Sequence, residues 1–342
     1  MIGLGHMGML HLKNCLHVDS VKVVAAADSS KRALKKAKLV GIKNLYTDYH
    51  DLLSDSVDVD TVIISLPNFL HFNSIKLSLE AGFNVFVEKP MAITVDDCRK
   101  IVKLVEKSDG KFMVGHCMRF INGIEKMKEI ADEGRIGNLE VVTLEQLLNG
   151  PFAHGVDFTP VPEWWFDPKK NGGGVLMDLG YHVIDLFRFF VGGDSKILFS
   201  CFDHKFNLSF EDGAIVILVS SDSSIKGIIN IGWYQKLVFP EYNFRAILHG
   251  NAGYVTSDNL VPRNIYLHAV KEGTKNFLRK IVGKQINPLS FSPYYESYYK
   301  ELQHFFDCIK NDSDPSISAI DGLKTLELIE EAYKTSSETQ FP

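Results

Sequence analysis

The segment GGGVLMDLGYHVID, residues 172–185, combines residue types that can move a proton. Asp178 and His182 lie four residues apart, so their side chains share a face of a helix, and Asp185 lies near that face, where it could orient or cap the pair. A neutral imidazole, with an ordinary pKa of ~6.5, can accept a proton at neutral pH. The glycines permit a sharp turn into the helix and could leave its N–H groups free for an anion. From the spacing alone, a surface ion pair is the more ordinary interpretation, and no convincing third ligand points to a metal site.

A second pattern with chemical meaning stands at the start of the chain, where residues 3–8 read GLGHMG. Glycines in the order G-x-G-x-x-G let the backbone approach a pyrophosphate, and the helix that follows offers free N–H groups. The apolar stretch 21–28 reads as a strand and ends in Asp28, twenty residues after Gly8, where a carboxylate can bind the adenosine ribose. A tight turn without a ligand is the alternative. We predict dinucleotide binding and favour NAD, because Asp28 would repel the 2′-phosphate of NADP, although Lys31 and Arg32 could reach such a phosphate.

Short apolar strands alternate with helices through the first third of the chain. We expect strands at 61–65, 84–90 and 111–116, and helices at 7–17, 31–41, 75–82 and 95–108. This order predicts a parallel sheet covered by helices on both faces. Ligands of such sheets bind beyond the carboxyl ends of the strands. The polar residues expected there are Asp28, Asn68, His71, Glu88, Lys89, His116 and Arg119.

The first strand is the feature that fits least well. Only Met1 and Ile2 precede Gly3, whereas a central strand normally has about five residues. Either the start is clipped or the first strand is unusually short. Cofactor binding or local stability could be weaker as a result.

After about residue 120 the pattern changes to strands without helices between them. Strands are expected at 139–148, 214–221, 225–234 and 243–250, and they predict an antiparallel sheet. Helices are expected at 124–137, 294–310 and 321–336. The loop at 149–174 is long, which is often a functional feature, and its Trp164 and Trp165 could stack on a sugar ring or simply plug the sheet.

Composition excludes several classes of partner. The chain of 342 residues has 37 Lys and Arg against 42 Asp and Glu, a net charge of -5, which argues against nucleic-acid binding. We find no run of about 18 apolar residues and no secretory signal, so we expect no membrane partner and a cytoplasmic location. The five cysteines are scattered without zinc spacing, and buried reduced thiols are the simplest interpretation.

Six motifs in order resemble the glucose-fructose oxidoreductase/inositol dehydrogenase family, the Gfo/Idh/MocA oxidoreductases. They are GLGHMG at 3–8, PNFLH at 67–71, EKP at 88–90, GHCMRF at 115–120, EGRIG at 133–137 and the glycine run with Asp178 and His182. The departures are the short start and HCM at 116–118, where polar residues are commoner. The resemblance implies a doubly wound α/β Rossmann domain, residues 1–119, followed by an α+β domain with a large, mostly antiparallel sheet, residues 120–342.

The resemblance also implies NAD(P)-linked oxidation or reduction of a sugar, cyclitol or related polyol. Its catalytic lysine falls on Lys89 and its Asp-x-x-x-His pair on Asp178 and His182. We therefore expect His182 to act as general acid/base, Lys89 to stabilise alkoxide charge and anchor substrate, and Asp178 to bind a hydroxyl. The residues expected to bind the cofactor are Gly3, Gly5, His6, Met7, Gly8, Asp28, Ser65, Pro67, Asn68, His71, Glu88 and Lys89. Those expected to bind the substrate are Lys89, Arg119, Trp164, Trp165, Asp178 and His182.

Two other functions stay open at this point. One is a dehydrogenase or reductase of a nucleotide-linked sugar, whose diphosphate could meet Lys169, Lys170 and Arg188. The other is a non-catalytic regulator that responds to NAD(P) or to a sugar, although such proteins would be expected to lack the lysine or the histidine. The resemblance further implies a homo-oligomer, either a dimer or a tetramer.

Overall fold

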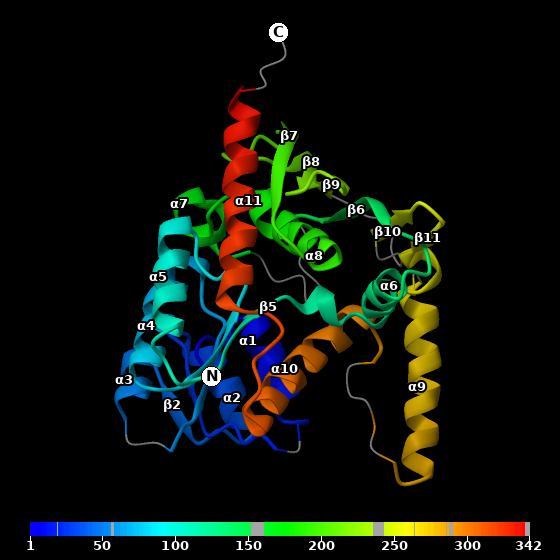
Figure 1. Cartoon of the computed structure of the whole chain (residues 1–342). Helices are drawn as coiled ribbons and strands as arrows, with labels where there is room; N and C mark the ends of the chain where they lie inside the picture. The colour runs from blue at the N-terminus through cyan, green and yellow to red at the C-terminus, as the bar shows by residue number, and fades with distance from the viewer. Residues whose placement is uncertain are drawn as a thin grey trace. The chain divides into compact units, whose positions relative to one another are not determined.

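The protein divides into two compact units in a computed structural model (Figure 1). The structure describes residues 1–18, 20–55, 58–151, 161–234, 243–262, 264–284, 286 and 290–338. Unit 1 contains residues 1–116 and 298–323, and unit 2 contains residues 117–297 and 324–342. This division differs from the one expected at residue 119/120 in two respects, because the boundary lies at 116/117 and a segment from the carboxyl-terminal part packs with unit 1.

Unit 1 contains two groups of parallel strands joined by the start of the chain. β1 (Ala25–Ala27) pairs with β2 (Asn44–Tyr46), and β3 (Thr61–Ile64), β4 (Asn84–Glu88) and β5 (Phe112–Gly115) pair in that order. Ile2 forms parallel bridges to both β1 and β3. Its N–H donates to Ile63 at 2.8 Å, and the N–H of Gly3 donates to Ala27 at 2.9 Å. Met1 and Ile2 thus occupy the central position of a Rossmann sheet, between β1 and β3.

Five helices lie in the amino-terminal part of unit 1, and side chains cap three of them. They are α1 (His6–Cys15), α2 (Lys31–Leu39), α3 (Tyr49–Ser54), α4 (His71–Glu80) and α5 (Val95–Val105). The side chains of Ser30, Asp48 and Thr94 accept hydrogen bonds from the first turns of α2, α3 and α5. β2 and α3 were not predicted, and the strand expected at 21–28 is confined to Ala25–Ala27.

The segment 298–323 belongs to unit 1 because it packs along β4 and β5. It holds most of α10 (Pro293–Asn311) and the beginning of α11 (Ala319–Glu338). The ring of Phe305 lies 5.8 Å from that of Phe86, and the N–H of Val114 donates to Ile317 at 3.3 Å. The apolar residues of the helix predicted at 294–310 thus close one side of the nucleotide unit.

Unit 2 is built on a six-stranded sheet in the order β11-β10-β6-β9-β8-β7. The strands are β6 (Leu139–Asn149), β7 (Ser195–Asp203), β8 (Gly213–Ser220), β9 (Lys226–Tyr234), β10 (Phe244–Gly250) and β11 (Gly253–Thr256). β6 and β9 are parallel and the other pairs are antiparallel, which confirms the mostly antiparallel sheet. The sequence did not predict β7 or β11.

One face of this sheet packs on α8 (Tyr181–Val191), which is buried along nearly its whole length. A Cβ atom on Gly227 of β9 would meet the ring of Phe187 at 2.6 Å, so the close approach requires a glycine. The other helices of the unit are α6 (Asn122–Asp132), the short α7 (Pro168–Asn171) and α9 (Ile265–Ile281), which was not predicted. Every helix within the described residues is too short or too polar to cross a bilayer. Four cysteines are buried as expected, but Cys201 is exposed.

Candidate active site

The glycines at residues 3–8 have three different surroundings. A Cβ atom on Gly3, whose φ is +87°, would meet the Ser65 carbonyl oxygen at 2.4 Å, and one on Gly8 would meet the Gly3 oxygen at 2.1 Å. Gly5 has no atom within 4 Å of its Cβ position. Gly3 and Gly8 are therefore needed for packing, whereas Gly5 leaves open space at the start of α1. No side chain caps α1, so its N–H groups suit a pyrophosphate. His6 and Met7 form its first turn.

Asp28 stands at the carboxyl end of β1 and holds the glycine loop. One carboxylate oxygen accepts the N–H of Leu4 at 2.6 Å, and the other accepts the N–H of Ser30 at 2.7 Å. The side chain stays partly exposed. Lys31 and Arg32, the residues that could favour NADP, are exposed in the first turn of α2. Contact of Asp28 with a ribose stays a prediction.

His71 joins the loops that follow β3 and β4. Its fully buried ring places Nδ1 2.7 Å from the Pro90 oxygen and Nε2 2.9 Å from the Leu66 oxygen. Burial lowers the pKa of His71, although these two carbonyl contacts oppose the shift. Because both ring nitrogens face backbone oxygens, the expected role in cofactor binding would be indirect, through the position of these loops. Ser65, Pro67 and Asn68 are partly buried beside the same loop, and the Ser65 hydroxyl has no hydrogen-bond partner among the described residues.

Lys89 directly follows β4 and is half-buried, and its peptide bond to Pro90 is cis. Its backbone N–H donates to Glu88 Oε2 at 3.2 Å, and Glu88 Oε1 lies 2.5 Å from Nε2 of His11 on α1. Burial raises the pKa of the Glu88 carboxyl, but the hydrogen bond and charge of His11, with the charge of Lys89, outweigh burial and lower the pKa below its ordinary value. An ionised Glu88 therefore ties the backbone of Lys89 to α1.

A second carboxyl group completes a buried cluster behind Lys89. Glu301 of α10 is fully buried, and its oxygens have no hydrogen-bond partner among the described residues. An oxygen of Glu301 lies within 4.8 Å of the ligand atoms of His11 and Glu88. Burial and the charge of Glu88 raise the pKa of Glu301 well above its ordinary value. Two ligands of one zinc ion, each at ~2.1 Å, would lie ~3.4 Å apart, so the 2.5 Å contact of His11 with Glu88 describes a hydrogen bond.

The glycine run in unit 2 binds an anion that belongs to the chain itself. Glu211 Oε1 accepts the N–H of Gly174 at 3.1 Å, the N–H of Leu176 at 3.0 Å and the hydroxyl of Tyr333 at 2.7 Å. A Cβ atom on Gly174 would meet the Glu211 backbone oxygen at 2.1 Å, and one on Gly173 would meet the Tyr333 hydroxyl at 2.2 Å. Burial raises the pKa of Glu211, partly opposed by these hydrogen bonds. The expectation that these N–H groups stay free for a ligand is therefore wrong for Gly174 and Leu176.

Asp178 and His182 lie where a π-helical turn, Leu176–Gly180, leads into α8. A π-turn of this kind is frequently found at functional sites. Asp178 is the one side chain in 173–187 that is not buried, whereas His182 is 5% exposed. The π-turn therefore leaves the Asp178 side chain partly exposed on a segment whose other side chains are buried.

Asp185, which the spacing placed near the Asp178–His182 pair, binds an arginine from another segment of unit 2. Its carboxylate binds Arg119 through two contacts, at 2.7 Å to Nε and 2.6 Å to Nη2, and both side chains are buried. The Arg119 guanidinium also lies 5.3 Å from the ring centre of Phe189. Arg119 is thus fixed to α8 by a bidentate pair, and its contact with substrate stays a prediction.

The two tryptophans of the long loop differ. The ring of Trp165 lies 5.1 Å from that of Trp233 on β9 and 6.0 Å from that of Phe210, so it packs on the sheet, but it is only half-buried and its contact with a sugar stays a prediction. Trp164 is half-buried in the same short turn, and its contact with a sugar stays a prediction. Residues 152–160 of this loop lie outside the described residues.

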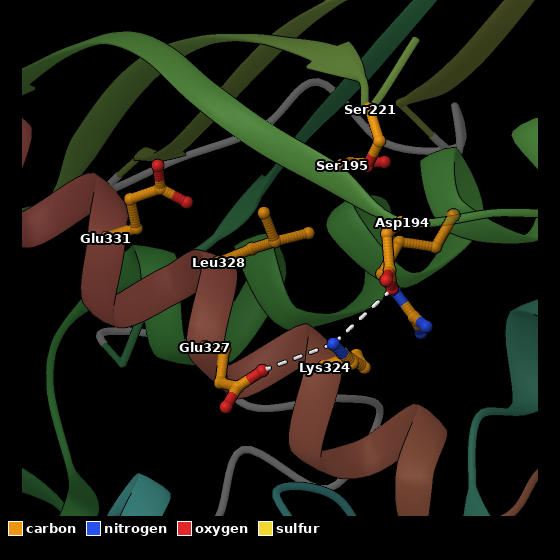
Figure 2. A pocket seen from close by; sticks show the side chains of 8 residues that line it. Asp194, Ser195, Ser221, Lys324, Glu327, Leu328 and Glu331 are labelled. Atoms are coloured by element: carbon orange, nitrogen blue, oxygen red, sulfur yellow. Dashed lines mark ion pairs between the residues drawn. The ribbon is translucent and has the colours of Figure 1, made fainter.

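A cavity of about 290 Å³ lies beside α11 and the start of β7 (Figure 2). It contains Arg188, which the diphosphate alternative invoked, and Lys324, but Asp194, Glu327 and Glu331 line it as well. Lys324 pairs with Asp194 at 3.5 Å and with Glu327 at 3.8 Å (Figure 2). Three carboxylates beside two cations oppose a diphosphate, and none of the residues predicted to be catalytic lines this cavity.

Comparison with known proteins agrees with this arrangement. A family model described as the oxidoreductase family, NAD-binding Rossmann fold, matches residues 1–116. A second, the oxidoreductase family C-terminal alpha/beta domain, matches residues 128–342. The chain belongs to the Gfo/Idh/MocA oxidoreductase family. It is an NAD-dependent oxidoreductase, and the residues around Gly5 fit the cofactor.

Individual members of the Gfo/Idh/MocA family are similar over nearly the whole chain. The myo-inositol 2-dehydrogenase of Thermotoga maritima is 25% identical over 342 residues, which cover 98% of this chain and 95% of the relative. The NAD⁺-dependent scyllo-inositol 2-dehydrogenase of Bacillus subtilis is 25% identical over 344 residues, 96% of this chain and 90% of the relative. The solved scyllo-inositol dehydrogenase of Lactobacillus casei, with NAD(H) and scyllo-inositol bound, shares the fold at a TM-score of 0.80 and 20% identity, with 99% and 96% of the two chains covered.

Three buried residues that the structure places around the residues of the candidate site were missing from the sequence prediction: His11, Glu211 and Glu301. Glu301 gave a signal, because an acid stands on the stripe formed by Tyr298, Leu302 and Phe305, where an apolar residue is expected. His11 lies three residues after Gly8 on a predicted helix, but nothing in the sequence connects it with Glu88. Glu211 lies in a loop, and no spacing marks it as the partner of the glycine run.

Proposed function

We propose that this oxidoreductase interconverts a secondary alcohol and a ketone on a cyclitol, sugar or related polyol, with Lys89, Asp178 and His182 as its catalytic residues. The observation that carries the proposal is the partly exposed carboxylate of Asp178 on a π-turn, one turn before a buried imidazole. A carboxylate of this kind suits a substrate with several hydroxyl groups, because it accepts hydrogen bonds from them. The similar enzymes of Thermotoga maritima and Bacillus subtilis act on inositols by their names.

Each residue has a separate role in this proposal. His182 takes the hydroxyl proton in its neutral form and returns it in the reverse reaction. The Lys89 ammonium stabilises negative charge that develops on the same oxygen and anchors the substrate. Asp178 binds a hydroxyl group and orients the other two side chains. NAD, when bound, supplies the acceptor for the hydride.

The substrate class is tested by the absorbance of NADH during incubation with NAD and a panel of polyols. The panel contains myo-inositol, scyllo-inositol, apiose and a simple hexose, with ethanol as a control alcohol. We expect turnover of at least one cyclitol or sugar and none of ethanol. A chain that binds NAD but turns over no member of the panel in either direction would contradict the proposed substrate class.

The catalytic role of Lys89 is tested by Lys89→Ala on the substrate so identified. We expect kcat to fall by about 10²–10³-fold, the usual cost of removing an electrostatic stabiliser, with little change in the Kd for NAD. Lys76→Ala provides the matched control, because Lys76 lies in unit 1 on α4 and is exposed. Near-normal kcat in Lys89→Ala would show that the role assigned to Lys89 is wrong.

We also propose that the protein is a homo-oligomer, either a dimer or a tetramer, and that it is cytoplasmic. In support of the first point, the face of the sheet opposite α8 carries exposed apolar side chains, Leu198 at 53%, Ile215 at 48% and Ile228 at 44%. Light scattering during size-exclusion chromatography measures the mass directly. A monomer at micromolar concentration would contradict the proposal.

A further inference from the structure

Helix α9 of unit 2 carries large apolar side chains that are exposed. Leu267, Val270, Phe277 and Ile281 are between 65% and 70% exposed, and Tyr266 and Leu278 are more than half exposed. Val282, directly after the helix, is 65% exposed. Single exposed apolar residues are ordinary, but a row of seven on one segment marks an interaction surface.

These side chains form one stripe along α9. They recur at intervals of three and four residues, the spacing of a single helix face. The opposite face attaches the helix to the protein. There Glu272 is buried, Ile265, Ala269 and Asn276 are half-buried, and Asn276 donates a hydrogen bond to the Ser290 hydroxyl at 3.0 Å. The helix is thus inverted relative to an ordinary surface helix, whose apolar face would point inward.

The charges around the stripe have one sign. Five basic residues, Lys271, Lys275, Arg279, Lys280 and Lys284, lie in the segment 264–284, against a single acid, Glu272. That acid is buried and forms an ion pair with Lys275. This segment is therefore strongly basic in a chain whose net charge is -5.

We infer that α9 is a surface helix that docks the enzyme on an anionic lipid bilayer, with its apolar stripe in the boundary between headgroups and acyl chains. An exposed apolar stripe flanked by Lys and Arg is the pattern of helices that lie in the plane of a membrane interface. Each basic residue near the surface adds attraction to anionic lipids.

A second copy of the chain is the rival occupant of the stripe. Two α9 helices placed face to face would bring their lysines together without acids to neutralise them, which opposes pairing. The sequence predicted no membrane partner because it has no run of about 18 apolar residues, but such a run marks a helix that spans a bilayer and not one that lies on its surface. The inference is independent of the proposed substrate and leaves the dehydrogenase reaction unchanged.

The test is flotation of the full chain with vesicles of phosphatidylcholine alone and of phosphatidylcholine with phosphatidylglycerol. We expect the protein to float with the anionic vesicles, to float far less with the neutral ones, and to be released by high salt, because salt screens the lysines. Phe277→Ser combined with Leu278→Ser should weaken binding by about tenfold or more. Lys271→Glu combined with Lys280→Glu should abolish the preference for anionic vesicles.

Matched controls come from α2, which is also basic and ends in an exposed leucine. Leu39→Ser and Lys38→Glu change an 80% exposed Leu39 and an exposed lysine on that helix, and both variants should float like the wild type. The circular dichroism and NAD affinity of every variant establish that it is folded. Absence of flotation, equal flotation of wild type and α9 variants, or an oligomer that dissociates when the stripe is changed while no vesicle binds would each overturn the inference.

Discussion

Two glycine-rich turns lead into helices in this protein, one in each unit, and their N–H groups have different surroundings. At residues 3–8, Gly5 has empty space around it, and no side chain caps α1. At residues 172–174, the Glu211 carboxylate already accepts the N–H groups of Gly174 and Leu176. The first turn is built to receive an external anion, whereas the second is closed by an internal one.

The difference teaches what a glycine pattern in a sequence means. Glycines report that something approaches the backbone closely, but they do not identify what approaches. At Gly174 it is the backbone and carboxylate of Glu211, and at Gly8 it is the oxygen of Gly3. Among Gly3, Gly5, Gly8, Gly173 and Gly174, Gly5 is the one whose Cβ position is open, as a ligand that approaches the backbone would require.

The closed turn should be the more sensitive to an added methyl group. Gly174→Ala places Cβ 2.1 Å from the Glu211 backbone oxygen, which cannot swing away as a flexible side chain would. We expect a loss of about 3 kcal/mol in the free energy of unfolding, the upper range for overpacking. Urea unfolding measures it. Gly193→Ala is the matched control, because no atom lies within 4 Å of its Cβ position, and a similar loss in both variants would contradict the prediction.

Removing the internal anion should have the next largest effect. Glu211→Ala leaves two buried N–H groups and the Tyr333 hydroxyl without an acceptor, and we expect a loss of about 2 kcal/mol. Glu211→Gln keeps an oxygen that can accept both N–H groups and should recover most of the loss. Urea unfolding of the two variants compares them directly. If the Gln variant were as unstable as the Ala variant, hydrogen bonding to the turn would not be what Glu211 contributes.

The alternation of strands and helices, the order of the motifs and the residue types were enough to predict the Rossmann fold and the large, mostly antiparallel sheet, and to select the residues of the candidate site. What the sequence could not supply was pairing between distant positions. Glu211 lies 37 residues from Gly174, and Arg119 lies 66 residues from Asp185. The spacing of Asp178, His182 and Asp185 suggested one cluster, but it could not predict that the Asp185 carboxylate binds Arg119.

The first strand is a second case in which the sequence could not predict pairing between distant positions. Two residues looked too few for a central strand, since a strand of that length has almost no apolar surface of its own. In the structure, Met1 and Ile2 are held by backbone hydrogen bonds to both neighbouring strands, and the side chain of Ile2 is fully buried. The position of Met1 and Ile2 is therefore set by their hydrogen bonds to β1 and β3, and a local sequence pattern cannot predict which strands will be adjacent.

The open turn should tolerate an added methyl group in the fold but not in the function. Gly5→Ala meets no atom of the protein, so the free energy of unfolding should change by less than about 0.5 kcal/mol. The methyl group would occupy the space proposed for the pyrophosphate, and we expect the Kd for NAD to rise by about tenfold or more. Calorimetric titration with NAD checks this. An unchanged Kd would show that the cofactor does not approach Gly5.

The smallest expected effect is a pH-dependent change in Tm, and it distinguishes the two buried carboxyl groups. These are Glu211, beside the closed turn, and Glu301, in the cluster with His11 and Glu88. Glu211 accepts three hydrogen bonds, whereas neither oxygen of Glu301 has a partner among the described residues. Burial and the charge of Glu88 raise the pKa of Glu301. Above the ordinary carboxyl pKa the folded chain therefore retains a proton that the unfolded chain has released, so this group makes stability fall as pH rises toward the folded pKa.

Glu301→Gln has no such proton, and the Tm of the variant minus that of the wild type should grow by on the order of 2–4 °C from mildly acidic to alkaline pH. Calorimetry at several pH values measures this difference, with Glu330→Gln, an exposed residue of α11, as the control for loss of a surface carboxylate. A difference in Tm that is constant with pH would mean that Glu301 is ionised in the folded protein, and that the cluster behind Lys89 carries one more negative charge than described.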